Sequence, residues 1–137
     1  MRIVASERGL QRLDWSGGRS VGPHALVEDA HAQLDEYFAG RRTEFDLPLD
    51  LAGTAFQHRA WLALTEIPYG ETRTYAEQAA RLGLSHGARA VGSANARNPL
   101  PVVVPCHRLV GAGGSLTGYA GGIGRKERLL RLEGALL

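Results

Sequence analysis

The segment from Thr74 to Pro99, TYAEQAARLGLSHGARAVGSANARNP, decides the fold of this chain. Thr74 and Glu77 have the spacing of a capping box, in which each residue satisfies a free backbone N–H at the start of a helix. The pattern predicts a short helix over Tyr75–Leu82, which Gly83 ends.

A second short helix is predicted directly downstream. Ser85 can cap it, and it runs through Ala88–Ala96 before Asn98-Pro99 stops it. The two helices lie about four residues apart, which matches the spacing of a helix-turn-helix. The spacing alone is a weak signal, because many helical pairs with no role at DNA share it. The small residues of the second helix indicate either close approach to a surface or tight packing in a core.

Upstream, the chain predicts another helix and a domain boundary. Thr54 and Gln57 repeat the capping-box spacing. The apolar residues that follow at helical intervals are Phe56, Ala60, Trp61 and Leu64. The segment Asp46–Gly53, which contains Pro48, is the candidate boundary.

The first part of the chain has the pattern of a small α/β lobe. Residues 1–15 alternate like short strands, and residues 25–39 have the period of an amphipathic helix that ends at Gly40. Its apolar stripe consists of Leu26, Ala30, Leu34, Tyr37 and Phe38. We therefore expect an α/β protein, with an N-terminal α/β lobe over residues 1–53 and a mostly helical domain over residues 54–137.

The C-terminal part begins with an apolar run, Pro101–His107, whose two prolines exclude a helix. They fit an edge strand or a buried irregular segment. Residues 111–124 are rich in glycine, which predicts a loop whose backbone approaches another group closely. This loop lacks the Gly-Lys-Ser/Thr ending of a phosphate loop. Arg125–Leu132 is predicted as the last helix, with Leu129 and Leu132 facing inward.

Composition limits the class of protein. The chain has 137 residues, of which 44% are hydrophobic, and a net charge of +2. Residues 1–53 carry a net charge of −3 and residues 54–137 carry +5, which fits a polyanionic partner or a solvated surface of skewed composition. We see no apolar run long enough to span a membrane and no signal peptide, and we expect a soluble cytoplasmic protein.

Cys106 is the only cysteine, which excludes an internal disulfide and a multi-cysteine zinc site. Its ordinary interpretation is a small buried hydrophobe. A nucleophilic role needs a thiolate, and therefore a nearby cation or base. His107 is adjacent, but neighbours on a strand point to opposite faces, so we expect a water molecule between the two side chains. Glu133 is the candidate carboxylate to orient the imidazole.

Several motifs together resemble one known family, that of the O6-alkylguanine-DNA alkyltransferases. They are IPYGETRTY at 67–75, ARAVG at 88–92, Asn98-Pro99, PCHR at 105–108 and YAGG at 119–122. The resemblance covers roughly residues 54–134 and rests on the order and spacing of all of these motifs.

The resemblance implies a single-use DNA-repair reaction with no cofactor and no metal. Cys106 would attack the alkyl carbon on guanine O6, and His107, through water and Glu133, would take the thiol proton. Tyr75 would donate a hydrogen bond to guanine N3, and Asn98 would tie the helical pair to the Cys106 segment. The residues implied to bind the base are Tyr119, Ala120 and Gly121 through backbone N–H groups and their loop, and Leu109 and Cys106 through carbonyls.

The same resemblance implies a double-stranded DNA partner that carries O6-alkylguanine, and a protein that acts as a monomer. The base must leave the stack to be reached. The second helix would enter the minor groove, Arg89 would fill the gap left by the flipped base, and Tyr75 would press on a phosphate. The residues implied to approach DNA closely are Ala88, Ala90, Gly92, Ser93 and Ala94.

The chain departs from the family pattern at three places. Its N-terminal lobe is short, Gly83–Gly87 stands where relatives often carry Asn-Pro or Ser-Pro, and Ala120 stands where Ser is common. Three alternatives remain: a non-catalytic lesion binder, a transcription regulator and a cysteine hydrolase. Cys106 argues against the first, and the scarcity of base-reading side chains on the second helix argues against the second. Multiple turnovers would support the third.

Overall fold

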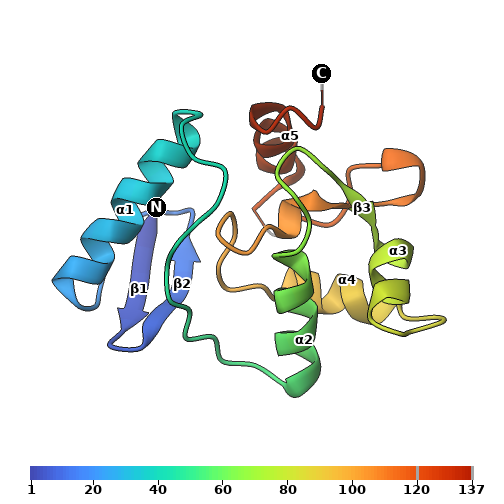
Figure 1. Ribbon diagram of the computed structural model, residues 1–137, viewed down its shortest axis with the longest axis horizontal. Coiled ribbons are helices and arrows are strands. Elements are labelled where there is room, and N and C mark those ends of the chain that lie inside the picture. Colours follow the sequence, from blue (N-terminus) through green and yellow to red (C-terminus); the bar gives the residue numbers. More distant parts are fainter. Residues whose placement is uncertain (120, 137) are drawn as a thin grey trace. The chain divides into compact units, whose positions relative to one another are not determined.

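The computed structural model describes residues 1–119 and 121–136. The chain divides into two units, Met1–Ala52 and Gly53–Leu137, whose elements are labelled in Figure 1. The sequence placed the boundary one residue later, after residue 53. The class is α/β, as expected, with the helix-turn-helix and the Pro-Cys-His-Arg segment in the second unit.

The first unit is built on a hairpin of β1 (Arg2–Ser6) and β2 (Gly9–Asp14), which pair antiparallel. Residues 48–50 run alongside β2, where the Leu10 N–H donates to the Pro48 carbonyl over 2.9 Å. Gly9 has a φ of +155°, and a Cβ there would lie 2.6 Å from the Pro48 carbonyl. This close approach requires glycine.

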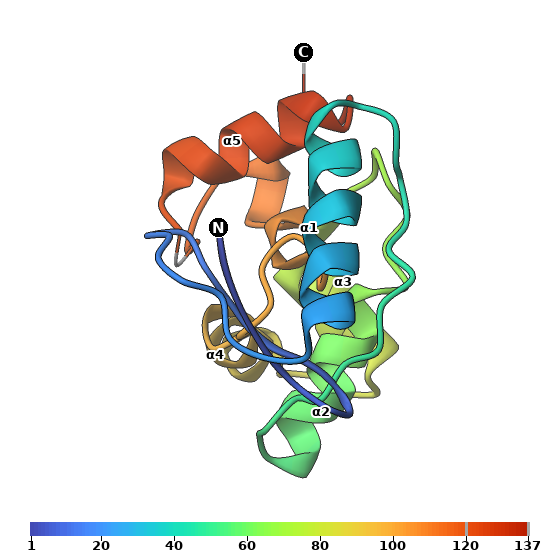
Figure 2. The ribbon, with the colours of Figure 1, turned by 90° about the vertical axis from the view of Figure 1, so that its left-hand side faces the viewer.

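Helix α1 (His24–Phe38) packs against β1 and completes the core of the first unit (Figure 2). Ala30, Leu34 and Tyr37 are buried, as the apolar stripe predicts. The inward position predicted for Phe38 is wrong, because its side chain is 41% exposed and its ring lies edge-on to Tyr37. One residue of helix turns the side chain about 100° away from the buried stripe.

The second unit begins with two helices whose capping boxes are confirmed. In α2 (Ala55–Leu64) the Gln57 N–H donates to the Thr54 hydroxyl, and the Gln57 side chain accepts from the Thr54 N–H. The same reciprocal pair joins Thr74 and Glu77 at the start of α3 (Tyr75–Arg81). These contacts satisfy backbone donors that a helix start leaves free.

Helix α4 (Ala88–Ala96) completes the helix-turn-helix, but the predicted cap is wrong. Ser85 is exposed, and α4 begins after Gly87 without a side-chain cap. The turn is set by packing instead, since a Cβ at Gly87 would lie 2.6 Å from the Leu84 side chain. The Trp61 indole N–H donates to the Ala94 carbonyl over 2.8 Å and holds α4 against α2.

The apolar run before Cys106 forms buried turns and not an edge strand. The two prolines remove backbone donors that a strand would need, and the Val104 N–H donates back to the Leu100 carbonyl over 2.9 Å. Cys106–Arg108 then forms the short 3-10 helix η1, which replaces the strand geometry expected for Cys106 and His107. Of the two structures that the sequence left open, the buried irregular segment is confirmed.

After η1, strand β4 (Leu109–Val110) pairs in parallel with β3 (Arg73–Thr74), which brings the Cys106 segment beside the start of α3. The glycine-rich stretch contains a second 3-10 turn, η2 (Ala112–Gly114), and leads to α5 (Ile123–Leu132). Within residues 1–119 and 121–136 we find no helix that is both long and apolar enough to cross a membrane.

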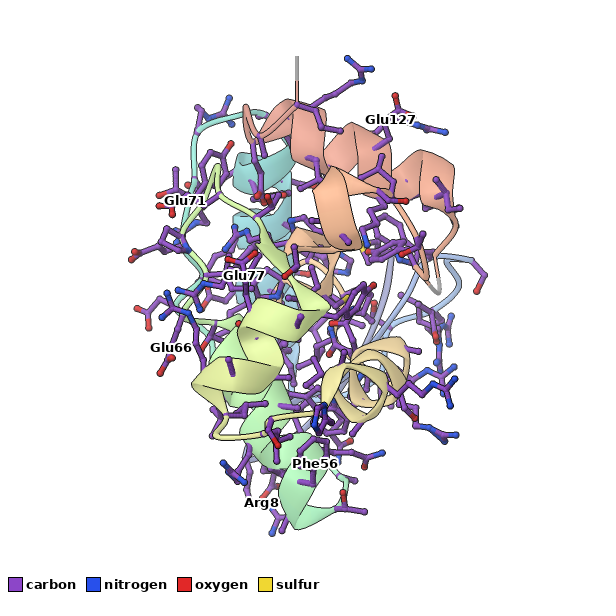
Figure 3. The ribbon with its side chains drawn as sticks, turned by 90° about the vertical axis from the view of Figure 1, so that its right-hand side faces the viewer. Arg8, Phe56, Glu66, Glu71, Glu77 and Glu127 are labelled. Atoms are coloured by element: carbon purple, nitrogen blue, oxygen red, sulfur yellow. The ribbon has the colours of Figure 1, made fainter. Side chains whose placement is uncertain are left out.

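The buried face of α5 differs in part from the prediction. Leu129 is buried as expected, but Leu132 is only half-buried and Leu130 is completely buried. Lys126 and Glu133 lie on the same buried face, at helical spacing from the leucines. Glu127 points outward from the opposite side of the helix (Figure 3).

Candidate active site at Cys106

Cys106 is the first residue of η1, and its side chain is buried. Burial raises the pKa of the thiol to about 11, because the low dielectric disfavours the thiolate. The Asn98 side chain and the charge of Lys126 act in the opposite direction. At neutral pH the thiol is therefore protonated in the resting protein, and nucleophilic attack requires a base.

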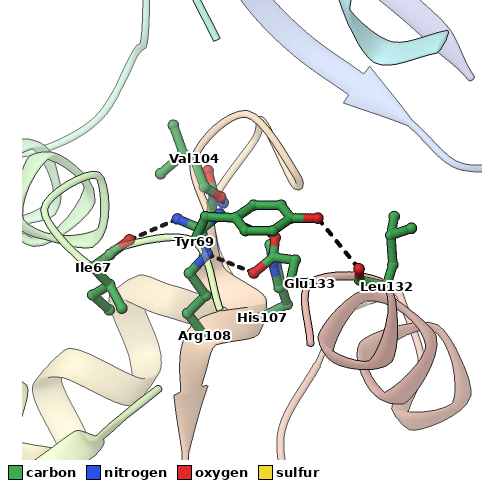
Figure 4. A network of polar contacts seen from close by, with 8 residues as sticks. Ile67, Tyr69, Val104, His107, Arg108, Leu132 and Glu133 are labelled. Carbon is green, nitrogen blue, oxygen red and sulfur yellow. Dashed lines mark hydrogen bonds and ion pairs between the residues drawn. The ribbon is translucent and has the colours of Figure 1, made fainter. Parts of the chain in front are cut away.

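Glu133, the residue that ends α5, is the centre of a buried network of polar contacts beside Cys106 (Figure 4). Its carboxylate accepts from His107 Nε2 over 2.7 Å and from Arg108 Nε and Nη2 over 2.9 and 3.0 Å. Arg108 Nη1 also donates to the Ile67 carbonyl over 2.6 Å. The tight turn of η1 is what allows two consecutive side chains to reach one carboxylate.

His107 has the arrangement of a general base. The Arg108 guanidinium favours the ionised form of Glu133, and an ionised carboxylate can only accept, so the proton of the neutral ring lies on Nε2. Burial lowers the pKa of His107 and keeps the ring neutral. Nδ1 is then an acceptor, and it has no hydrogen-bond partner within residues 1–119 and 121–136.

Tyr75 lies at the start of α3 and is linked to the glycine-rich segment. Its hydroxyl donates to the Thr117 carbonyl over 3.2 Å, and Lys126 Nζ donates to the same carbonyl over 2.8 Å. The ammonium group also lies 5.8 Å from the centre of the Tyr75 ring. Burial raises the pKa of Tyr75 and lowers that of Lys126 to about 8. The phenol is thus a hydrogen-bond donor at neutral pH.

Two family models match this chain. Residues 55–135 match the model described as 6-O-methylguanine DNA methyltransferase, DNA binding domain, and residues 1–51 match the ribonuclease-like domain of the same proteins. The chain belongs to the 6-O-methylguanine DNA methyltransferase family. The resemblance inferred from the motifs is thereby confirmed.

Curated relatives in this family carry the name methylated-DNA--protein-cysteine methyltransferase. The protein from Mycolicibacterium paratuberculosis is 60% identical over 133 residues, which cover 97% of this chain and 78% of that protein. The Mycobacterium tuberculosis protein is 61% identical over 101 residues, which cover 74% of this chain but only 61% of the relative. The crystal structure of Mycobacterium tuberculosis OGT in complex with DNA superposes with a TM-score of 0.83 at 51% identity, covering 92% of this chain and 81% of that one.

Most of the residues expected at DNA lie on the exposed side of α4. Ala88, Arg89, Ala90 and Ser93 are exposed. Gly92 is half-buried, and a Cβ there would lie 3.8 Å from the Tyr75 ring. The expectation for Ala94 is corrected, because this residue is buried and faces α2, where its carbonyl accepts from Trp61.

The residues expected to bind the base lie on two segments of the second unit. Leu109 is buried in β4, directly after η1. Tyr119 is buried near the end of the glycine-rich stretch, and Gly121 is half-buried. Ala120 lies outside the described residues. Asn98 Nδ2 donates to the Val104 carbonyl over 2.8 Å, which links the end of α4 to the segment that precedes Cys106.

Sequence reasoning missed three polar residues of this candidate site: Arg108, Lys126 and Asn95. Lys126 is the only lysine in the chain, and its helical spacing with Leu129, Leu130 and Glu133 could have indicated a buried position. Asn95 Nδ2 donates to the Cys106 carbonyl over 3.2 Å. No local pattern separates Asn95 from an ordinary polar residue of a surface helix. No cluster of three or more metal-ligating side chains occurs in the described part of the chain.

Proposed function

We propose that this family member removes an alkyl group from O6 of guanine in duplex DNA and keeps it on Cys106. The observation that carries the proposal is the buried thiol next to a His107–Glu133 pair whose imidazole has an unused acceptor nitrogen. A buried cysteine needs no oriented imidazole for packing alone. The names of the curated relatives support the same reaction.

The reaction conserves atoms without a cofactor. A water molecule relays the thiol proton to His107 Nδ1, while Glu133 and Arg108 stabilise the imidazolium that forms. The sulfur attacks the alkyl carbon, the S–C bond forms, and the C–O6 bond breaks with its electron pair going to the base. Tyr75 leaves the Thr117 carbonyl and donates to guanine N3 as this charge develops. A proton then returns to the base, and the protein keeps a thioether that nothing in this sequence of steps reverses.

The base reaches the thiol by leaving the duplex, because O6 is inaccessible to a buried sulfur inside the base stack. The exposed side of α4 enters the minor groove, where its small residues permit close approach, and Arg89 takes the place of the flipped base. One protein molecule reacts with one lesion, which requires only a monomer. The family description of residues 55–135 as a DNA binding domain supports contact between this unit and DNA.

The test is the intact mass of the reduced protein after incubation with duplex DNA that contains one O6-methylguanine, followed by peptide mapping. The expected result is a gain of roughly 14 Da, one methylene, on the peptide that contains Cys106, which saturates at one per protein. Folded protein that binds the lesion without gaining mass would instead be a damage-recognition protein. Turnover of an acyl substrate without a lasting mark would indicate a hydrolase.

A further inference from the structure

Asn95 is a buried amide on the inner side of α4, and the mechanism above does not use it. Its Nδ2 donates to the Cys106 carbonyl, but its Oδ1 is buried with no hydrogen-bond partner of ordinary geometry in the described chain. Leaving a buried polar atom unpaired is destabilising, because the atom gives up its hydrogen bonds to water and gains none in the protein. Such a cost, next to the reactive cysteine, points to a role that an apolar residue could not fill.

Asn95 also lies close enough to Tyr75 to oppose, to a small extent, the rise in the pKa of the phenol that burial causes. The Asn95 side chain thus lies near Tyr75 and is hydrogen-bonded to the Cys106 carbonyl. Asn95 cannot easily move, since the neighbouring Ala94 carbonyl is held by the Trp61 indole. The Asn95 amide, which donates to the Cys106 carbonyl over 3.2 Å, therefore fixes the position of that carbonyl.

This pair of groups complements one edge of guanine. On its minor-groove edge guanine presents the N3 acceptor directly beside the exocyclic amine, a donor. The Tyr75 hydroxyl matches N3, and the Cys106 carbonyl, which has a second lone pair free after it accepts from Asn95, matches the amine. Hypoxanthine has the same ring but lacks the amine.

We infer that Asn95 is a specificity-determining residue, which holds the Cys106 carbonyl as the acceptor for the exocyclic amine of the alkylated base. The inference rests on the proposed function and extends it: Asn95 makes the site selective for a purine with a 2-amino group. Asn95 acts through the Cys106 carbonyl, so it is a positioning residue and takes no part in the transfer of the alkyl group itself.

The experiment compares two free bases that differ only in the amine, O6-benzylguanine and O6-benzylhypoxanthine. The second-order rate of S-benzylation is measured by mass for the wild-type chain and for Asn95→Leu, which has similar volume and no amide. We expect the ratio of the two rates to fall about tenfold in the variant, corresponding to one hydrogen bond. The rate with the hypoxanthine should change much less than the rate with guanine.

Gln78→Leu is the matched control, since it also removes a buried amide from the helix-turn-helix, but the oxygen of that amide accepts from Arg73 Nη1. It should leave the ratio of rates unchanged. If Asn95→Leu does not fold, as judged by its circular dichroism and thermal transition, Asn95→Ser replaces it. An unchanged ratio in a folded Asn95 variant would overturn the inference alone. A wild-type chain that is not benzylated by either base would overturn the proposed function as well.

Discussion

At the scale of single residues, Glu133 is the centre of the buried polar network beside Cys106. Its side chain is fully buried and serves two partners, His107 and Arg108, of which only the arginine is permanently charged. One carboxylate thus neutralises a buried cation and sets the tautomer of the proposed base. Stability and the proposed catalysis are therefore coupled at this residue.

Replacing Glu133 with Gln is expected to lower both the stability of the fold and the rate of alkyl transfer. The buried guanidinium of Arg108 would lose its anionic partner, and the free energy of unfolding should fall by about 3 kcal/mol. The rate of alkyl transfer should fall about 100-fold, because the imidazolium of His107 is no longer stabilised. Urea titration and benzylation kinetics measure the two effects.

The matched control is Glu127→Gln on the same helix. Glu127 pairs with Arg131 over 2.8 Å, but both side chains are about half exposed to solvent. Exposed pairs of this kind contribute less than about 1 kcal/mol. If Glu127→Gln lowered the stability as much as Glu133→Gln does, the buried network of Glu133 would not be the source of the loss.

A pH profile tests the role of His107. The ring must be neutral to accept the thiol proton, so protonation abolishes the base and activity is lost as the pH falls through the pKa of His107. Burial lowers this pKa below its ordinary value of about 6.5. With free O6-benzylguanine as substrate, the acid limb of the rate should have its midpoint below pH 6.5. A midpoint at pH 7 or above would be inconsistent with a buried neutral imidazole.

At the scale of elements, the helix starts differ in what fixes them. The capping box of α3 uses the side chains of Thr74 and Glu77, whereas α4 begins at a packed glycine. We therefore expect Thr74→Ala to lower the free energy of unfolding by about 1 kcal/mol. Ser85→Ala should change it by less than about 0.5 kcal/mol, as for an exposed position. If the two substitutions had equal effects in urea titrations, Ser85 would have to be a cap of α4.

Helix α4 also allows DNA binding to be separated from chemistry. Arg89 is exposed, and the flipped-base model gives it a role only in duplex DNA. Reaction with a free base should not require it. Arg89→Ala should slow repair of O6-methylguanine in a duplex at least about tenfold, in line with the cost of leaving an unstacked gap unfilled. Benzylation by O6-benzylguanine should be nearly unaffected. Equal losses of rate on both substrates would contradict a role of Arg89 in base flipping.

At the scale of the whole molecule, charge is divided unevenly between the two parts of the chain. Residues 54–137 carry a net charge of +5 and residues 1–53 carry −3. A DNA partner of the second unit should bind with a strong dependence on salt, because each phosphate contact releases counterions.

The variant Cys106→Ala allows this binding to be measured without transfer. It should retain affinity for duplex DNA with O6-methylguanine, and three phosphate contacts would lower that affinity roughly fortyfold between 50 and 200 mM salt. Adding Arg89→Ala should reduce the salt dependence by about one contact, whereas adding Arg8→Ala, in the first unit, should not. Fluorescence anisotropy across a salt series measures the slope. A slope near zero would exclude backbone contacts as the source of affinity.

Local patterns in the sequence predicted the main helices and identified Cys106 as the candidate nucleophile. The capping boxes at Thr54 and Thr74, the period of α1 and the motif around Cys106 each depend on residues a few positions apart. Their physical basis is backbone hydrogen bonding within one turn, which the chain encodes locally. The family followed from the same motifs.

Only the tertiary structure decided how the site is assembled. The His107–Glu133 contact joins residues 26 positions apart, and the placement of Asn95 under the Cys106 carbonyl depends on how α4 packs against α2. The 3-10 turn at Cys106 arises from packing of the proline-rich run and not from any strand or helix propensity. Burial of Asn95, Arg108 and Lys126 is a property of the folded core, which no window of sequence contains, because it depends on which distant surfaces meet.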